Sequence, residues 1–183
     1  MIIEIPRAIT SEQCSFIKEA VTPFLLNAEQ HTYNRDGKTV NITRIPELRE
    51  VDNFLNNFFK TIYEKIIFHR FRPMNEFLSG DSGYEYHLYG PNEVCNYHAD
   101  GEIHDNSQET MLRYASVTLH LNTVHKGGEL VFPAQNKSVK TEEGKIVVFP
   151  PYGMFGHYTT PSQEQREVIV TWFVYKNVII RRL

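Results

Sequence analysis

Three side chains from two distant parts of the sequence carry the donor atoms of a metal site. His98 and Asp100 are separated by one residue, and in an extended strand both side chains project from the same face. His157 supplies a second imidazole from further along the chain. Two imidazoles and one carboxylate on one side of an ion leave its other coordination positions free for O2 and a co-substrate. The spacing therefore predicts a metal centre at these three residues.

The same residues also have a purely structural interpretation. A His-x-Asp pair arises easily by chance in a chain with 8 histidines and 22 acidic residues. His98 is then a core histidine, Asp100 a turn residue before Gly101, and His157 a loop residue. A short motif gains weight only from its context, so the rest of the chain has to decide between the two interpretations.

The composition predicts one globular domain over residues 1–183. The chain is 41% hydrophobic and 13% aromatic, enough for a sizeable core in one domain. A formal charge of −3 and the absence of a basic run before Arg181 disfavour nucleic acid as a partner. Cys14 and Cys95 lack the spacing of a zinc site or a disulfide framework, and no apolar stretch suits a signal peptide or a membrane span. We therefore expect a soluble cytoplasmic protein without a membrane partner, and its oligomeric state stays open.

The elements that must position the metal ligands begin with two helices. Thr10 and Gln13 resemble a capping box for a helix over residues 11–26. Pro46 precedes a strongly amphipathic stretch over residues 47–66, which predicts a long helix packed on a sheet. The first part of the chain, residues 1–70, is thus expected to be mainly helical support.

Residues 83–175 have a different character. Short runs rich in Val, Ile, Tyr and Phe alternate with Gly, Pro and Asn, which is typical of an antiparallel sandwich or barrel. The predicted strands cover residues 84–89, 94–100, 114–121, 129–133, 145–150, 154–158 and 167–175. Loops with extended ends are predicted over residues 31–45 and 68–82. The predicted fold class is α+β, mainly β, with N-terminal helices buttressing a β-sandwich.

Further residues accompany the metal-ligand candidates at characteristic spacing. Tyr89 comes before the first histidine, and Arg166 follows the second. His120 lies in a predicted strand, and a Gly-Gly turn comes before Leu130. Arg166 and Trp172 share one face of the last strand because side chains alternate along it.

With these residues the sequence resembles the Fe(II)/2-oxoglutarate-dependent dioxygenases, and among them the prolyl 4-hydroxylase-like group. The resemblance covers roughly residues 84–175. It implies a double-stranded β-helix, a jelly-roll sandwich with the metal at its open end. It also implies that His98, Asp100 and His157 bind Fe(II). Related halogenases carry a small residue where this chain has Asp100, so the aspartate implies hydroxylation.

The resemblance also implies contacts to 2-oxoglutarate. Arg166 matches the basic residue that holds the distal carboxylate, a task suited to a permanently charged guanidinium. Tyr89 matches a tyrosine of the co-substrate pocket, while His120 replaces a tyrosine that helps to hold 2-oxoglutarate in close relatives. His120 therefore either donates a hydrogen bond to the co-substrate or is a packed or surface histidine. Leu130 is expected to form an apolar wall, with Trp172 beside Arg166. No role in the site is expected for the remaining histidines, which are His31, His69, His87, His104 and His125.

The implied reaction consumes O2 and 2-oxoglutarate, hydroxylates an aliphatic C–H group and releases succinate and CO2. Ascorbate is a further candidate cofactor. A peptidyl-proline is the predicted substrate, and Tyr97, Tyr152 and Trp172 offer aromatic surface for its ring. Candidate specificity loops cover residues 32–44, 70–82 and 102–111. The alternatives are hydroxylation of a free amino acid or other small metabolite, a non-catalytic module that binds metal or 2-oxoglutarate, and a structural sandwich that binds proteins.

Overall fold

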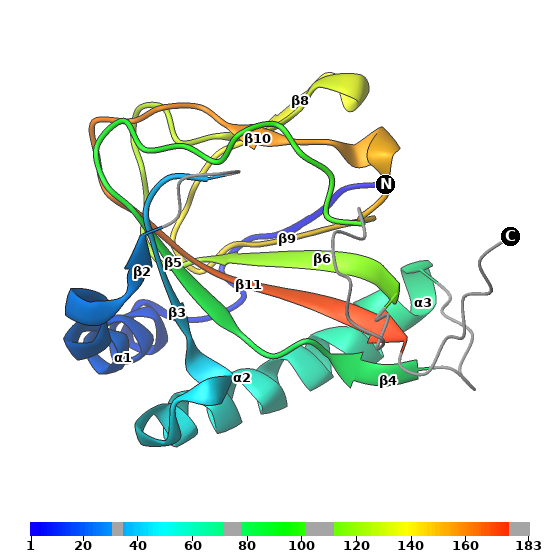
Figure 1. Ribbon diagram of the computed structural model, residues 1–183. Helices are drawn as coiled ribbons and strands as arrows, with labels where there is room; N and C mark the ends of the chain where they lie inside the picture. Colours follow the sequence, from blue (N-terminus) through cyan, green and yellow to red (C-terminus); the bar gives the residue numbers. More distant parts are fainter. Residues whose placement is uncertain (31–34, 72–77, 102–111, 176–183) are drawn as a thin grey trace, which may run out of the picture.

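A large antiparallel sheet forms the middle layer of the molecule, with helices on one face and a smaller sheet on the other (Figure 1). The computed structural model describes residues 1–30, 35–71, 78–101 and 112–175. The large sheet has the strand order β1-β9-β6-β11-β5-β3-β2, and β4 pairs with β11. Its strands are β1 (Ile3–Ile5), β2 (Glu29–Gln30), β3 (Lys38–Asn41), β4 (Leu78–Asp81), β5 (Glu85–Tyr89), β6 (Leu112–His120), β9 (Ile146–Phe149) and β11 (Arg166–Tyr175).

The small sheet covers the face of the large sheet opposite the helices. Its order is β10-β7-β8, with bounds β7 (Leu130–Phe132), β8 (Lys137–Val139) and β10 (Tyr158–Thr159). Leu130 and Phe132 pack against Val147 and Phe149 of β9 in a separate apolar cluster. Burial of such side chains between two sheets stabilises a sandwich, so this cluster holds the small sheet in place.

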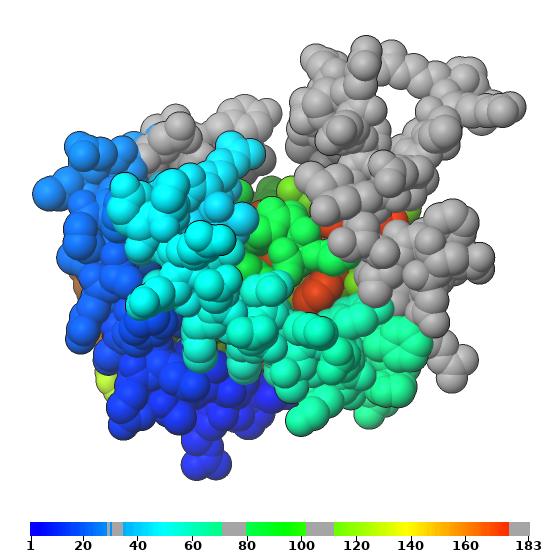
Figure 2. Space-filling model, turned by 90° about the horizontal axis from the view of Figure 1, so that it is seen from below, coloured from blue at the N-terminus to red at the C-terminus, as the bar shows by residue number. Residues whose placement is uncertain are grey.

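The helical layer lies under the large sheet, where α1 (Ser11–Val21) and α2 (Arg49–Ile62) cover the face seen in Figure 2. The predicted capping box is present: the Thr10 hydroxyl accepts a hydrogen bond from the Gln13 N–H at 3.3 Å, and the Gln13 side chain accepts one from the Thr10 N–H at 2.9 Å. Along α2 the buried residues recur at helical spacing, and Phe59 stacks on Tyr84 with ring centroids 5.5 Å apart. The predicted packing of this helix on the sheet is therefore confirmed.

The helix bounds differ from the prediction. The first α-helix ends at Val21 rather than at residue 26 and continues as a 3-10 helix, η1 (Thr22–Asn27). Pro23 lacks the N–H that the α-helical ladder requires, which explains the change. The second helical stretch is longer than predicted and reaches into the expected loop after residue 67. Its pieces are η3 (Pro46–Leu48), α2, the π-helix η4 (Tyr63–Ile67) and α3 (Phe68–Phe71).

The strand predictions need three corrections. Residues 94–100 form no strand: Cys95 and His98 make isolated bridges to two different partners. Residues 154–158 are not one strand: Met154 and Phe155 end the 3-10 helix η7 (Gly153–Phe155), and β10 begins only at Tyr158. Strands β1 and β8 were not predicted, because each has only three residues and so too few to show alternation. Two shorter 3-10 helices are η2 (Ile42–Arg44) and η6 (Pro133–Gln135).

Helices and sheet share one continuous core. Ile17 of α1 and Leu55 of α2 belong to the same buried cluster as Tyr86 and Val117 of the sheet. We propose on this basis that residues 1–183 form a single domain, as the composition predicted. Within the described ranges no helix combines the length and the apolar character needed to cross a membrane.

Candidate metal centre

The two histidines of the predicted triad are held together by a backbone bridge. The His98 N–H donates to the His157 carbonyl at 3.0 Å, and the His157 N–H donates to the His98 carbonyl at 2.8 Å. Their ring centroids are 4.4 Å apart. Beyond Asp100, the Gly101 N–H donates to the carbonyl of Pro151 at 2.6 Å. These bonds fasten the loop before β6 to the segment before β10, so residues 59 positions apart meet by pairing rather than by strand alternation.

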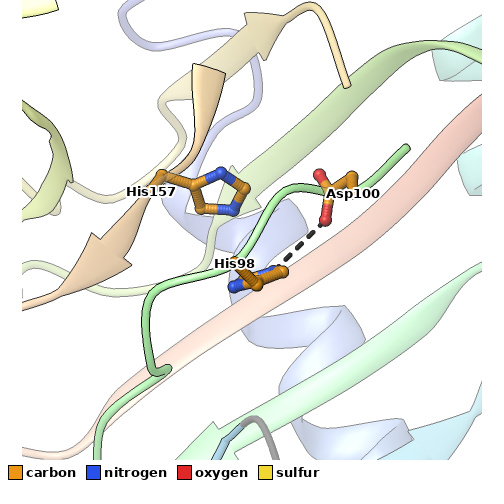
Figure 3. A group of neighbouring side chains, drawn as sticks. All are labelled: His98, Asp100 and His157. Atoms are coloured by element: carbon orange, nitrogen blue, oxygen red, sulfur yellow. Dashed lines mark ion pairs between the residues drawn. The ribbon is translucent and has the colours of Figure 1, made fainter. Parts of the chain in front are cut away.

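The donor atoms of the triad face one another (Figure 3). His98 Nδ1 lies 2.8 Å from the Asn96 carbonyl and His157 Nδ1 lies 3.1 Å from the Phe155 carbonyl. A carbonyl only accepts hydrogen bonds, so each Nδ1 carries a proton and Nε2 is the ring nitrogen left to bind a metal; on His98 the metal would displace the ion pair of Nε2 with Asp100. One ligand atom from each of His98, Asp100 and His157 lies within 4.8 Å of the others. The donor set therefore fits a ferrous ion bound on one side.

The electrostatics of the triad favour a cation. Asp100 is 8% exposed; burial opposes its charge, but the hydrogen bond from His98 and the nearby His157 hold the pKa of this carboxyl below its ordinary range. Burial disfavours the charged form of His98 as well, yet Asp100 and Cys95 raise its pKa to about 11. His98 Nε2 lies 3.3 Å from an Asp100 carboxylate oxygen. The carboxylate is thus negatively charged and paired with a positive neighbour, which a metal ion would replace.

Apolar rings shield one side of the triad from water. The Phe132 and Phe149 rings lie 5.4 Å and 4.8 Å from the His157 ring, measured between centroids. They come from the small and the large sheet respectively, so the packing of the two sheets fixes the orientation of His157. A dry wall of this kind strengthens the interactions of charged ligands beside it.

All the residues that the sequence predicts for the site lie around one small cavity of about 50 Å³. The three ligand candidates share it with Tyr89 of β5, His120 of β6, Leu130 of β7, and Arg166 and Trp172 of β11. Their roles remain predictions, but the fold brings them together from strands of both sheets.

Arg166 is a buried cation with an open side. Its side chain is 5% exposed, its guanidinium carbon lies 4.0 Å from the centre of the Tyr89 ring, and one N–H donates to the Thr159 hydroxyl at 3.4 Å. Among the described residues no carboxylate pairs with it. Burying an unpaired charge is costly, so the cavity is suited to a ligand that brings a carboxylate.

His120 is a second buried polar side chain of the cavity, and its ring is neutral. It is fully buried, and neither ring nitrogen has a hydrogen-bond partner among the described residues. Burial, together with the positive charges of Arg166 and Lys145, lowers its pKa to about 3. A neutral imidazole has one donor and one acceptor, so His120 can donate one hydrogen bond to a carboxylate held by Arg166.

The buried His120 leads to a testable pH dependence. Its pKa in the folded state is about 3 against an ordinary value of 6.5, so between these values the unfolded chain binds the proton more readily. The contribution of His120 to the free energy of unfolding is complete above pH 6.5. It declines as the pH falls, by up to about 1.4 kcal/mol per pH unit. We expect urea unfolding at pH 7 to 4 to show a shallower decline for His120→Leu than for the unsubstituted chain. The exposed His125 provides the control, and an unchanged slope in His120→Leu would contradict the buried neutral state.

Sequence reasoning missed several residues of the site. His87 is buried beside the cavity, two residues before Tyr89 on the same face of β5, and that alternation was the available signal. Arg35 and Cys95 also line the cavity. Arg113 donates to the Asp100 carbonyl at 2.8 Å and lies 3.9 Å over the Trp172 ring. The positions of Arg35 and Arg113 depend on pairing between distant segments, for which the sequence has no local signal.

The predicted aromatic surface divides into buried and exposed parts. Trp172 is 8% exposed, whereas Tyr97 and Tyr152 are 63% and 55% exposed. The Tyr97 ring lies directly against Gly156, where any side chain would collide with it. Residues 102–111, His31 and His104, and the tail from residue 176 lie outside the described part of the chain, as do parts of the other two candidate loops.

The sequence profile of the 2OG-Fe(II) oxygenase superfamily matches residues 84–174. The chain belongs to this superfamily. It is therefore a 2-oxoglutarate-dependent dioxygenase, as predicted, and the match contains all three ligand candidates. A search of curated proteins by sequence found no match.

Solved structures show what fold this oxygenase has. It is similar to a viral collagen prolyl hydroxylase from Paramecium Bursaria Chlorella virus-1 (TM-score 0.70, 16% identity, 95% of each chain covered). It also resembles a Pseudomonas putida prolyl-4-hydroxylase (0.68, 17%, 95% of this chain and 92% of that one). A Trichoplax adhaerens prolyl hydroxylase, solved with a hypoxia inducible factor peptide fragment, matches with a TM-score of 0.74, 16% identity, and 95% and 83% coverage. The predicted jelly-roll core with prolyl 4-hydroxylase-like architecture is confirmed.

Proposed function

We propose that this oxygenase hydroxylates an aliphatic C–H group of a peptidyl-proline, with iron held by His98, Asp100 and His157. One observation carries the proposal: three converging metal donors share a cavity with a buried guanidinium that has no acidic partner in the described part of the chain. Iron and 2-oxoglutarate, when bound, activate O2, so that 2-oxoglutarate, O2 and R–H become succinate, CO2 and R–OH. Membership of the superfamily implies these cofactors, and we propose which residues bind them.

The chain's own residues then have separate tasks. Arg166 holds the distal carboxylate of 2-oxoglutarate by paired charge-assisted hydrogen bonds, and His120 donates one more. Tyr89 lies across the Arg166 guanidinium and keeps it in place. Leu130 closes the apolar side of the same cavity. Together they orient the co-substrate and keep water away from it.

A polypeptide substrate is supported by the site's surroundings. In this proposal the metal and the co-substrate occupy the cavity of about 50 Å³, so most of a substrate must lie on the surface outside it. Exposed Tyr97 and Tyr152 lie in the segments that carry His98 and His157, and aromatic faces pack well on proline rings. The three prolyl hydroxylases of similar fold agree with this choice of substrate without establishing it.

The proposal is tested by anaerobic titration with Fe(II), with and without 2-oxoglutarate. We expect a weak visible charge-transfer band only when both are present, because chelation of the ferrous ion by the 2-oxo acid produces it. In air, the same protein should form succinate in an iron-dependent manner. His157→Ala should lose both signals.

His125→Ala is the matched control, since His125 is exposed and does not line the cavity. It should keep the band and the succinate. Folded protein that shows no band at saturating iron and 2-oxoglutarate would contradict the oxygenase site. Adding ascorbate to the aerobic assay tests the separate prediction that it sustains turnover.

A further inference from the structure

A second, larger hollow lies beside the metal-site cavity. It is a groove of about 490 Å³, against about 50 Å³ for the cavity, and this size lies within the range of ligand sites. Arg35 lines both spaces. The groove therefore begins where the cavity ends.

One side of the groove lies on the same face of the large sheet as the cavity, while Val40, Phe24 and Ile45 of its lining belong to the core on the helix face. Side chains alternate along β5, so Glu85, His87 and Tyr89 point to one side. Glu85 lines the groove, whereas His87 and Tyr89 line the cavity. On the neighbouring strand β3, Asn41 pairs with Glu85 and Thr39 with His87, and both line the groove. The groove thus continues the cavity across β5 and β3.

An ion-paired cluster forms the wall between them. Arg35 donates to His87 Nδ1 at 3.1 Å and lies 3.5 Å from the Glu85 carboxylate, which accepts a hydrogen bond from His87 Nε2–H at 3.0 Å. Burial is the largest influence on His87 and lowers its pKa to about 4, so the ring is neutral. The charges of Arg35 and Glu85 therefore cancel within the wall.

Because of Arg44, the residues that line the groove carry a net positive charge. The Asn41 side chain accepts a hydrogen bond from the Arg44 N–H at 3.2 Å and so caps η2, which places Arg44 at the rim of the groove. Its side chain is exposed, and within the described ranges no acidic residue forms an ion pair with it. Phe24 and Ile45 add apolar surface to the same lining.

We propose that this groove binds the segment of a polypeptide substrate that flanks the residue to be hydroxylated, and that Arg44 selects an acidic residue in that segment. The inference rests on the proposed function. A ligand that reaches both spaces must be elongated, because Glu85 and Tyr89 are four residues apart on β5, about 14 Å. An extended peptide spans this distance in roughly four residues. The amide and hydroxyl groups of Asn41 and Thr39 suit peptide backbone, and the charge of Arg44 suits Asp or Glu.

A peptide library tests the proposal directly. Peptides with a fixed central proline and random flanks are bound anaerobically to the full chain loaded with Fe(II) and 2-oxoglutarate, and the bound peptides are sequenced. We expect Asp and Glu to be enriched about fivefold, three to five residues from the proline and on one side only, as for one partly exposed charge pair. Arg44→Glu should replace this preference with one for Lys and Arg.

Arg49→Glu provides the matched control, because Arg49 is exposed and lines neither space. It should keep the acidic preference of the unsubstituted chain. No acidic enrichment, enrichment that survives in Arg44→Glu, or equal loss in Arg49→Glu would each overturn the assignment. The charge-transfer band of the unsubstituted chain separates the two proposals. If the band is present and the library shows no acidic preference, only the groove proposal is contradicted. If the band is missing, the proposed oxygenase site itself is contradicted.

Discussion

Asp100→Ala will abolish hydroxylation and iron-dependent succinate formation, with a loss of at least about a thousandfold. The carboxylate is the only anionic donor of the triad, and second-shell changes alone cost metal sites about 10- to 100-fold. Its removal leaves two neutral imidazoles, which hold Fe(II) far more weakly in competition with water. The measurement is succinate formed per protein at increasing Fe(II), alongside iron retained after desalting.

The control for this variant is Asp52→Ala on α2, whose carboxylate accepts a hydrogen bond from the Thr43 hydroxyl at 2.8 Å and does not line the cavity. It should retain activity. Circular dichroism of both variants shows whether they fold. A folded Asp100→Ala protein that still produces hydroxylated product would remove this residue from the metal centre.

The sequence was sufficient for most of the fold because its periodicities are strong. The stripe along α2 and the apolar runs of β6, β9 and β11 follow the spacing of their elements closely. The interruption of α1 at Pro23 was readable from proline chemistry but was overlooked. Strands as short as β1 exist through pairing with β9, and three residues contain no such pattern.

The metal-ligand residues were predicted from the sequence, but the strand that was expected to align two of them is absent from the described structure. His98 and Asp100 were placed on one strand, but His98 makes only an isolated bridge, to His157. Tertiary contacts bring these two residues to His157: the backbones of the two histidines pair with each other, and the Gly101 N–H donates to the Pro151 carbonyl. The contribution of Arg35 depends on its bridge to Cys95, a contact between segments 60 residues apart in the sequence. The family resemblance identified the candidate site residues, whereas only the fold shows which neighbouring residues position them.

Arg166→Ala will weaken 2-oxoglutarate binding by about a hundredfold or more while leaving iron binding intact. Removing one partner of a buried, hydrogen-bonded charge pair costs about 2–5 kcal/mol, and Arg166 is the buried cation of the cavity that lacks an acidic partner among the described residues. The metal donors belong to other segments, so they keep their geometry. The measurement is the KM for 2-oxoglutarate, with iron content determined in the same samples.

Thermal unfolding separates this role from a structural one. A ligand that binds only the folded state stabilises it in proportion to its affinity, so 2-oxoglutarate with Mn(II) should raise the Tm of the unsubstituted chain but not that of Arg166→Ala. Without ligand the variant loses packing on Tyr89 and also a costly unpaired charge, so its Tm should change much less than its affinity. Arg166→Lys should recover part of the affinity, since it keeps the charge but not the paired geometry. Equal KM values for Arg166→Ala and the unsubstituted chain would contradict the anchor, because no other described cation of the cavity is buried as deeply beside His120.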